Sequence, residues 1–213
     1  KEQGKILHIG ITNHRIGVAR EAVASGVYET LQFPFSLLAS PQDINLVEST
    51  VSNGMGFVAM KAMSGGLIRS GRAAAAFIAQ YPVLPIWGVQ REAELQEFLD
   101  YLREPPELTA ELETIMEKDR SELSGDFCRG CGYCMPCPQG IEINTCARMS
   151  LLLRRAPSAQ NLSPRGQEMM KKIETCLNCG ACKSKCPYGL DTPALLRRNY
   201  EDYKRVLAGE TAI

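Results

Sequence analysis

Short apolar runs alternate with helical patterns four times over roughly the first 105 residues. The apolar runs predict buried strands and read KILHIGI (5–11), TLQF (30–33), GFVAMK (56–61) and VLPIW (83–87). The helical patterns cover residues 15–25, 41–54, 69–80 and 91–102. Alternation of this kind predicts parallel strands with helices outside. Because a (β/α)8 barrel takes about 250 residues, or roughly 31 per unit, these four units predict half of such a TIM-type barrel.

Capping residues mark several helix ends. Ser40-Pro41-Gln42-Asp43 combines an N-cap serine, a first-turn proline and an acidic N3 residue. Ser163-Pro164 opens a helix over RGQEMMKKIE in the same way. The last helical segment, TPALLRRNYEDYKRVLAG, closes at Gly209.

Two further helices complete the expected organisation. TCARMSLLLRRA (145–156) reads as one helix ended by Pro157, and residues 107–123 read as a mostly charged connecting helix. The predicted domains are therefore a half barrel over residues 1–105, a linker helix over 106–124 and an α-helical domain over 125–213.

Charge and cysteine usage restrict the kind of protein. Basic and acidic residues number 24 each, and no block of like charge predicts a nucleic-acid or membrane surface. No run of about 18 apolar residues is present, so no membrane-spanning segment is expected. All nine cysteines lie in the last 86 residues, and a reducing cytoplasm is the expected setting. The chain opens on KEQGKILHIG without a methionine, so its first residue is not expected to be the native start.

Eight of the cysteines form two runs, CRGCGYCMPCP (128–138) and CLNCGACKSKCP (176–187). The second has the spacing of the bacterial ferredoxin run, in which three cysteines hold one 4Fe-4S cube and the fourth, before proline, reaches the other cube. We therefore predict two 4Fe-4S clusters with crossed ligands, since Pro138 mirrors Pro187. One cluster takes Cys128, Cys131, Cys134 and Cys186, and the other takes Cys137, Cys176, Cys179 and Cys182.

Other interpretations of the cysteines are considered as well. Two residues separate Cys134 from Cys137 where the standard run has three, so four evenly spaced cysteines could serve one cube. Zinc would favour pairs of cysteines over triplets, and disulfides would not favour thiols two residues apart. Cys146 lies outside both runs and is expected to be a small buried apolar residue on a helix.

The second region resembles the α-helical ferredoxin domains found as modules of larger oxidoreductases. The resemblance rests on the two cysteine runs, which lie 39 residues apart from Cys137 to Cys176, with helical sequence between them. A domain this short buries little core, so the clusters are expected to hold it folded.

The first region resembles the second half, strands five to eight, of an aldo/keto reductase barrel. The matching segments are HIGITNH, ETLQFPFSLL, GFVAMKAMSGGLI and VLPIWGVQREAELQEFL, within residues 5–103. With the cysteine-rich tail, the chain is similar to the branch of that family that carries a C-terminal ferredoxin domain. The resemblance implies an NAD(P)H site made by Thr12, Asn13 and Gln32 at the nicotinamide carboxamide, Lys61, Gly65 and Gly66 at the pyrophosphate, and Gly88, Val89 and Arg91 at the 2'-phosphate and adenine. Met60 stands where the family has an aromatic residue that stacks on the nicotinamide.

Elementary chemistry agrees with this assignment but leaves other roles open. Each of these residues follows an apolar run, and ligands of parallel barrels sit at the C-terminal ends of the strands. The helix that opens at Arg91 also offers a positive dipole end to an anion. Thr12 and Asn13 could instead only cap the next helix, Lys61 could be a solvated lysine, and Gly65-Gly66 could be only a turn. No G-x-G-x-x-G is present, so a doubly wound dinucleotide fold has no support.

The family's catalytic tetrad of Tyr, Asp, Lys and His comes from strands one to four, which this sequence does not contain. His8 is expected in the core or a helix layer and His14 at a helix start, so neither is a candidate base and no catalytic residue is assigned. A half barrel exposes two strand edges, so the N-terminal half is expected from the same or a separate chain.

Two functions remain open at this stage. The first is a part of an NAD(P)-dependent aldo/keto reductase-like oxidoreductase, whose two clusters pass single electrons to an unknown partner. The second is a catalytically inactive barrel that serves as an iron–sulfur electron-transfer or structural docking module.

Overall fold

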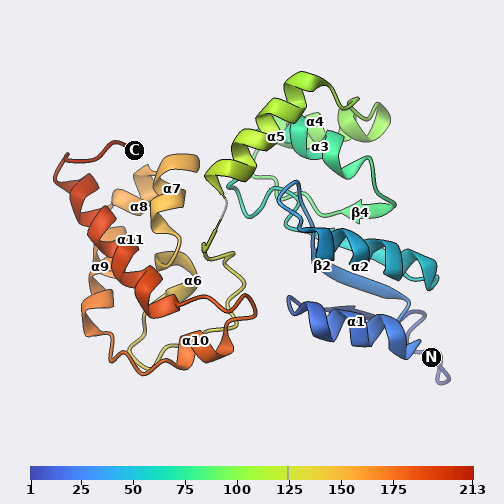
Figure 1. Cartoon of the computed structure of the whole chain (residues 1–213), viewed down its shortest axis with the longest axis horizontal. Helices are drawn as coiled ribbons and strands as arrows, with labels where there is room; N and C mark the ends of the chain where they lie inside the picture. Colours follow the sequence, from blue (N-terminus) through green and yellow to red (C-terminus); the bar gives the residue numbers. More distant parts are fainter. Residues whose placement is uncertain (124) are drawn as a thin grey trace. The chain divides into compact units, whose positions relative to one another are not determined.

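A parallel sheet of four strands organises the first part of the chain. The structure is a computed structural model that describes residues 1–123 and 125–213. It divides into two compact units, with the boundary at residues 123 and 124. Figure 1 shows the strands and the helices α1 to α5 in the first unit, and the helices α6 to α11 in the second.

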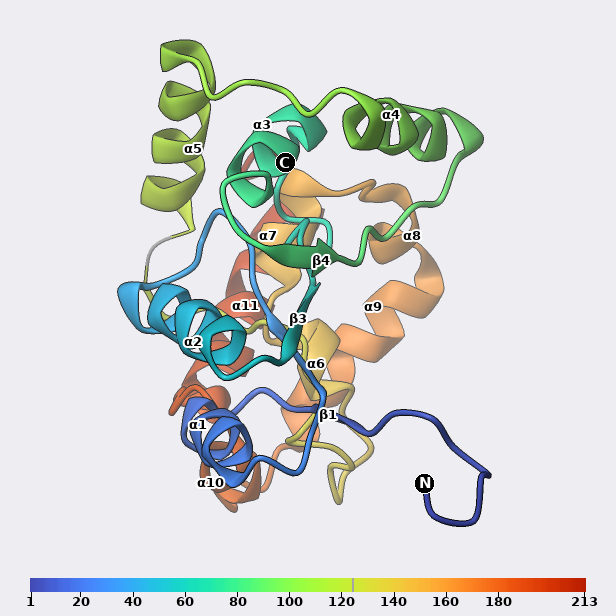
Figure 2. The same cartoon turned by 90° about the vertical axis from the view of Figure 1, so that its right-hand side faces the viewer.

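The first unit alternates strands and helices in chain order. Its elements are β1 (Gly10–Thr12), α1 (Ile16–Ser25), β2 (Thr30–Pro34), α2 (Pro41–Ser52), β3 (Gly56–Met60), α3 (Gly71–Ile78), β4 (Val83–Pro85), α4 (Glu92–Arg103) and α5 (Ala110–Glu122). The strands pair in the order β1-β2-β3-β4 and every pair is parallel. In Figure 2, β1, β3 and β4 follow one another along the sheet, and the packed helices α1 and α2 lie on one flank. The predicted alternation of parallel strands and outer helices is confirmed.

One face of this sheet is covered by helices. Leu31 and Phe33 of β2 and Phe57 and Ala59 of β3 have at most 4% of their surface exposed, and they pack against apolar residues of α1, α2, α3 and α5. Burying a Leu or Phe side chain contributes about 1.5–3 kcal/mol, so this layer accounts for much of the unit's stability. The neighbouring positions point to the opposite face, because successive strand residues alternate.

On the opposite face, residues in register form a row across all four strands. The register places Thr12 beside Gln32, Gln32 beside Val58, and Val58 beside Leu84. Leu84 has 66% of its surface exposed, whereas Gln32 and Val58 are half-buried. The apolar runs were predicted to be buried strands, which holds for the covered face, whereas Leu84 on the other face is exposed. Within the first unit, helices α1, α2, α3 and α5 pack on the covered face.

The first predicted strand is shorter than expected. KILHIGI was assigned to residues 5–11, but pairing with β2 begins at Gly10 because Thr30 is the first partner that β2 offers. Ile6 and Leu7 are 50% and 80% exposed. The His8 side chain is exposed and contacts the Glu29 carboxylate, so the expectation that His8 lies in the core or a helix layer is wrong.

The capping predictions in the first unit are confirmed. The Ser40 hydroxyl accepts a hydrogen bond from the Asp43 N–H, and the Asp43 carboxylate accepts one from the Ser40 N–H at 2.8 Å, with Pro41 at the first helical position of α2. Helix α5 packs on α3, and the Arg120 Nε donates to the Leu37 carbonyl at 2.9 Å. The charged segment over residues 107–123 therefore packs within the first unit.

The second unit is built around its last helix. Its elements are α6 (Ile143–Cys146), α7 (Met149–Arg155), α8 (Ala159–Leu162), α9 (Pro164–Lys171), the 3-10 turn η1 (Lys172–Thr175), α10 (Ala181–Lys185) and α11 (Thr192–Leu207). Helix α11 contacts α6, α7, α9 and α10. Ser163 caps α9 as predicted, and Gly209 follows α11 with a positive φ of 74°.

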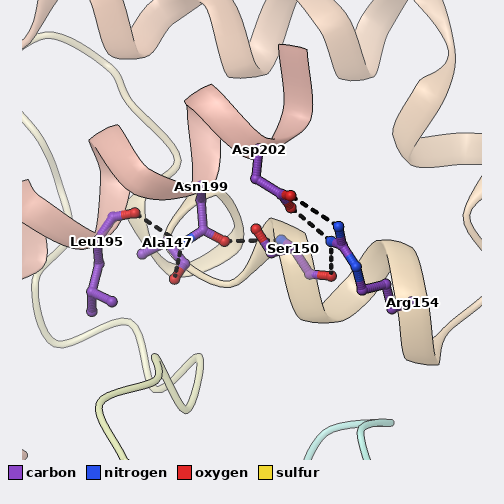
Figure 3. Close-up of polar contacts among 6 residues, drawn as sticks. All are labelled: Ala147, Ser150, Arg154, Leu195, Asn199 and Asp202. Atoms are coloured by element: carbon purple, nitrogen blue, oxygen red, sulfur yellow. Dashed lines mark hydrogen bonds and ion pairs between the residues drawn. The ribbon is translucent and has the colours of Figure 1, made fainter. Parts of the chain in front are cut away.

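The segment 145–156 is not the single helix that was predicted. Helix α6 ends at Cys146 and α7 starts at Met149, because Arg148 takes a non-helical backbone conformation with φ −131° and ψ 16°. Asn199 of α11 bonds the backbone on both sides of this break, as Figure 3 shows. None of the helices in the described part of the chain is long and apolar enough to cross a membrane.

Candidate metal centre and nucleotide site

Two cavities in the second unit are lined by cysteines from both runs. The first holds about 330 Å³ of space, partly open to solvent, and its wall includes Cys128, Cys131, Cys134 and Cys186. The second holds about 450 Å³, also partly open to solvent, and its wall includes Cys134, Cys137, Cys176, Cys179 and Cys182. Each wall thus combines thiols that are distant in sequence. Cys134 lies in both walls.

The local backbone explains how the thiols converge. Residues 128–138 form no helix, and Gly130 has a positive φ of 62°, which lets the loop turn between Cys128 and Cys131. In the second run, Gly180 also has a positive φ (73°) and starts the short helix α10, which carries Cys182. That helix ends at Lys185, so Cys186 and Pro187 continue in an extended direction toward the first cavity.

Burial favours the neutral thiol over the thiolate at several of these cysteines. Burial raises the pKa of the Cys128 and Cys182 thiols, and it raises the pKa of Cys134 to about 11. Neighbouring cysteines contribute to the increase at Cys134, with Cys128 and Cys131 on one side and Cys182 on the other. Because the ligand form is the thiolate, a metal that binds here has to displace these protons.

All nine cysteines are free thiols. Within residues 1–123 and 125–213, no three His, Cys, Asp or Glu side chains are arranged around a single metal ion. A cube spreads its four thiolates over four irons. The ninth cysteine, Cys146, is fully buried in α6 with its Sγ 3.9 Å from the Met169 carbonyl, and burial raises its pKa to about 12. This position agrees with the predicted buried, apolar role.

Candidate nucleotide residues gather at the C-terminal ends of β1 and β2. Thr12 ends β1 and pairs in register with Gln32, and the Asn13 N–H donates to the Gln32 carbonyl at 3.2 Å. Asn13 is 7% exposed, and its Oδ1 accepts a hydrogen bond from the Arg15 N–H at 2.9 Å. Its Nδ2 is buried and has no hydrogen-bond partner among the described residues. The Oδ1 of Asn13 therefore stabilises the start of α1, and its Nδ2 remains available as a hydrogen-bond donor.

The loop after β3 lies near the same strand ends. Lys61 follows β3 in a left-handed conformation with φ 58°, and Gly65 and Gly66 continue the turn with φ values of 67° and 86°. Burial and, to a smaller extent, the Lys61 ammonium lower the pKa of His14 to about 4. The Lys61 charge thus acts on the loop that follows β1, which also contains Asn13.

The segment after β4 differs from the expectation in one respect. The Arg91 guanidinium binds the Glu94 carboxylate, with Nε and NH2 at 2.9 and 2.6 Å from Oε1. The other Glu94 oxygen accepts the N–H groups of Gln90 and Arg91, which holds the pKa of Glu94 below its usual value. The Glu94 carboxylate therefore already occupies the start of α4, where an anion of the nucleotide was expected. Glu94 was missed in the sequence, although its position three residues after Arg91 is that of a capping-box acid.

Comparison with known families agrees with both regions. Residues 1–76 match the model of the aldo/keto reductase family, and residues 127–191 match that of a 4Fe-4S dicluster domain. The first match contains Thr12, Asn13, Gln32, Lys61, Gly65 and Gly66, whereas Gly88, Val89 and Arg91 lie beyond it. The second contains all eight cysteines of the two runs. No curated protein matches the chain. The chain therefore combines a region similar to the aldo/keto reductase family with a region similar to a 4Fe-4S dicluster domain, and this combination supports an oxidoreductase with iron–sulfur electron transfer.

Proposed function

We propose that the chain is part of an NAD(P)-dependent aldo/keto reductase-like oxidoreductase that is coupled to two 4Fe-4S clusters with crossed ligands. The observation that carries this proposal is the composition of the two cavity walls. One contains Cys128, Cys131, Cys134 and Cys186, and the other contains Cys137, Cys176, Cys179 and Cys182 together with Cys134. Each predicted ligand set thus surrounds one cavity.

The strand ends of the first unit support a nicotinamide nucleotide site. The free Nδ2 of Asn13 can donate to a carboxamide oxygen, and the Gln32 side chain lies on the adjacent strand. Lys61 and the turn at Gly65-Gly66 supply a positive charge and open backbone where a pyrophosphate would lie. These residues bind and orient the nucleotide, and the described strands carry no group to which we assign proton transfer.

The uncovered face of the sheet supports a half barrel with a partner. In a closed barrel, this face would meet the side chains of the other strands in the interior. Leu84, which is 66% exposed here, would then be buried. The N-terminal half of the barrel, in the same or a separate chain, would cover that face and would bring the residues that protonate a carbonyl.

The two cofactors differ in the number of electrons that they exchange in one step. When bound, nicotinamide exchanges a hydride, which carries two electrons, and each cube carries one electron at a time. A flavin or a stepwise acceptor between them would make this exchange of pairs for single electrons possible. The cysteine loops of the chain would hold the clusters, in cavities that are partly open to solvent.

Metal content tests the clusters directly. Anaerobically purified protein is expected to contain about eight irons and eight sulfides per chain, with broad visible absorption that bleaches on reduction. Protein that binds zinc tightly and holds no iron would contradict the proposal.

Cysteine variants test the crossed ligands. Cys128→Ser combined with Cys186→Ser removes two ligands of a single cluster if the ligands cross, so about half of the iron is expected to remain. If each run holds its own cube, the same double variant damages both clusters and loses nearly all the iron. Cys146→Ser is the matched control, because Cys146 lines neither of these cavities, and it is expected to keep the full iron content.

A second function is a catalytically inactive barrel that serves as an iron–sulfur electron-transfer or docking module. One observation favours it, because Asn13 Oδ1 and the Arg91 guanidinium are already engaged by Arg15 and Glu94. Titration of the full-length protein with NADPH and NADH separates the two functions. Binding of either nucleotide supports the oxidoreductase, and no binding favours the module.

A further inference from the structure

Arg148 is a half-buried cation next to Gly130, in the loop of the first cysteine run. It occupies the break between α6 and α7, and its guanidinium lies against the loop of the first cysteine run. A Cβ built on Gly130 would lie 3.1 Å from the guanidinium carbon and 3.3 Å from Nε, so the absence of a side chain at Gly130 allows this approach. The Nε of Arg148 is buried and has no hydrogen-bond partner among the described residues.

Arg148 lies near one ligand in particular. The Gly130 N–H donates to the Cys128 Sγ at 3.4 Å, and the Arg148 guanidinium lies against the same Gly130. A buried guanidinium is stable only when its charge and its N–H groups are matched. A thiolate that ligates a metal at Cys128 would supply both.

The break that carries Arg148 is held rigidly by α11. The Asn199 Nδ2 donates to the Ala147 carbonyl at 3.1 Å, and its Oδ1 accepts the Ser150 N–H at 2.9 Å. Figure 3 shows these bonds on the residues that flank Arg148, with the Arg154–Asp202 ion pair one turn further along α7. The backbone of Arg148 is therefore held in place, whereas its Nε has no hydrogen-bond acceptor among the described residues.

We propose that Arg148 donates a hydrogen bond to the cluster held by Cys128, Cys131, Cys134 and Cys186, at the Cys128 sulfur, and raises the reduction potential of that cluster. This inference rests on the proposed function. Reduction adds one negative charge to a cube, and a nearby cation with a hydrogen bond to its sulfur stabilises the reduced form. The two clusters then differ in potential, and the one beside Arg148 is reduced first.

A redox titration of the full-length protein with its clusters tests the proposal. In Arg148→Gln, the equilibrium constant for reduction of one cluster is expected to fall about tenfold, a shift of about 59 mV for a one-electron couple, while the other cluster keeps its potential. Arg148→Lys keeps the charge and is expected to show a smaller decrease. The control is Arg205→Gln, which removes an exposed positive charge from α11. Equal potentials in Arg148→Gln and Arg205→Gln would overturn the inference.

A spectroscopic measurement covers the case in which Arg148→Gln assembles no cluster. Electron–nuclear double resonance on reduced protein, labelled with 15N-arginine, is expected to detect a weakly coupled nitrogen. The measurement is made in the Arg129→Lys variant, because Arg129 lies in the wall of the first cavity and its nitrogens would otherwise contribute to the signal. No nitrogen coupling would overturn the role of Arg148. Absence of iron and sulfide from the unmodified protein would instead overturn the proposed function.

Discussion

The pKa of His14 depends on the surroundings of its side chain in the folded protein. Its pKa is lowered to about 4 by burial and by the Lys61 ammonium, whereas an unfolded histidine titrates near 6.5. Between these two values the unfolded chain binds a proton at His14 and the folded chain does not. The free energy of unfolding of the first unit therefore decreases as the pH falls from about 6.5 to about 4.

We predict that His14→Gln makes this pH dependence shallower, because the uncharged amide has no proton to gain on unfolding. Urea unfolding followed by the fluorescence of Trp87, the single tryptophan, reports on the first unit. His8→Gln removes the other imidazole, which is exposed, and serves as the control. Identical slopes for His14→Gln and the unmodified protein would contradict this prediction.

Arg91 is the second residue with a measurable consequence. We predict that Arg91→Ala weakens NADPH binding by the full-length protein about tenfold, with less effect on NADH, since a hydrogen bond to a charged group is worth about 1.5–3 kcal/mol. Glu94→Gln is expected to strengthen NADPH binding, because the carboxylate competes for Arg91. Arg103→Ala, at the other end of α4, is the control. An equal effect of Arg91→Ala on both nucleotides would remove Arg91 from the 2'-phosphate.

Helix α11 shows how one element fixes the others in the second unit. Asn199 is 5% exposed and satisfies the Ala147 carbonyl and the Ser150 N–H. The Arg154 guanidinium pairs with both Asp202 oxygens, at 2.6 and 2.9 Å. The Tyr203 hydroxyl donates to the Asn161 carbonyl at 2.7 Å. Polar contacts from one helix thus hold the α6–α7 break and the end of α8 in place.

We predict that Asn199→Ala destabilises the second unit by about 1–3 kcal/mol for each buried backbone group left without a partner. The loss of visible cluster absorption during anaerobic urea titration measures this effect. Tyr200→Phe on the same helix loses only an exposed hydrogen bond to Glu174 and is expected to change little. Similar midpoints for the two variants would show that Asn199 does not brace the break.

The sequence predicted those elements whose ends depend on local chemistry. The capping box at Ser40 and Asp43, the N-cap at Ser163 and the stop at Gly209 need only neighbouring residues, and all are found. The break at Arg148 was missed because nothing in TCARMSLLLRRA interrupts a helix. That break depends on Asn199, which lies about fifty residues away and meets it only in the folded unit.

At the scale of the whole molecule, the sheet with one covered face is the main feature. Leu84 and Leu102 are both exposed, at 66% and 76%, but Leu84 lies on the sheet and Leu102 on the helix α4. We predict that Leu84→Lys lowers the free energy of unfolding of the full-length protein by more than about 1.5 kcal/mol, because closure of the barrel buries it. Leu102→Lys is the control with no expected effect. Equal free energies of unfolding for Leu84→Lys and Leu102→Lys would mean that the face of the sheet that carries Leu84 stays exposed.

The candidate site was predictable to different degrees in the two units. The cysteine positions follow from spacing alone, because three thiols two residues apart are constrained to one loop. The engagement of Arg91 by Glu94 could have been expected from their capping-box spacing. The buried donor of Asn13 and the place of Arg148 depend on side-chain geometry that spacing does not encode. His8 was misplaced because β1 begins only at Gly10, two residues after it.

Cys134 lies in the walls of both cysteine cavities. Two paramagnetic centres that share a wall residue are close enough for their spins to interact. In fully reduced protein, the electron paramagnetic resonance spectrum is therefore expected to show broadened, split features instead of the sum of two independent signals. Partial reduction, which leaves most molecules with one unpaired spin, should restore a simple spectrum.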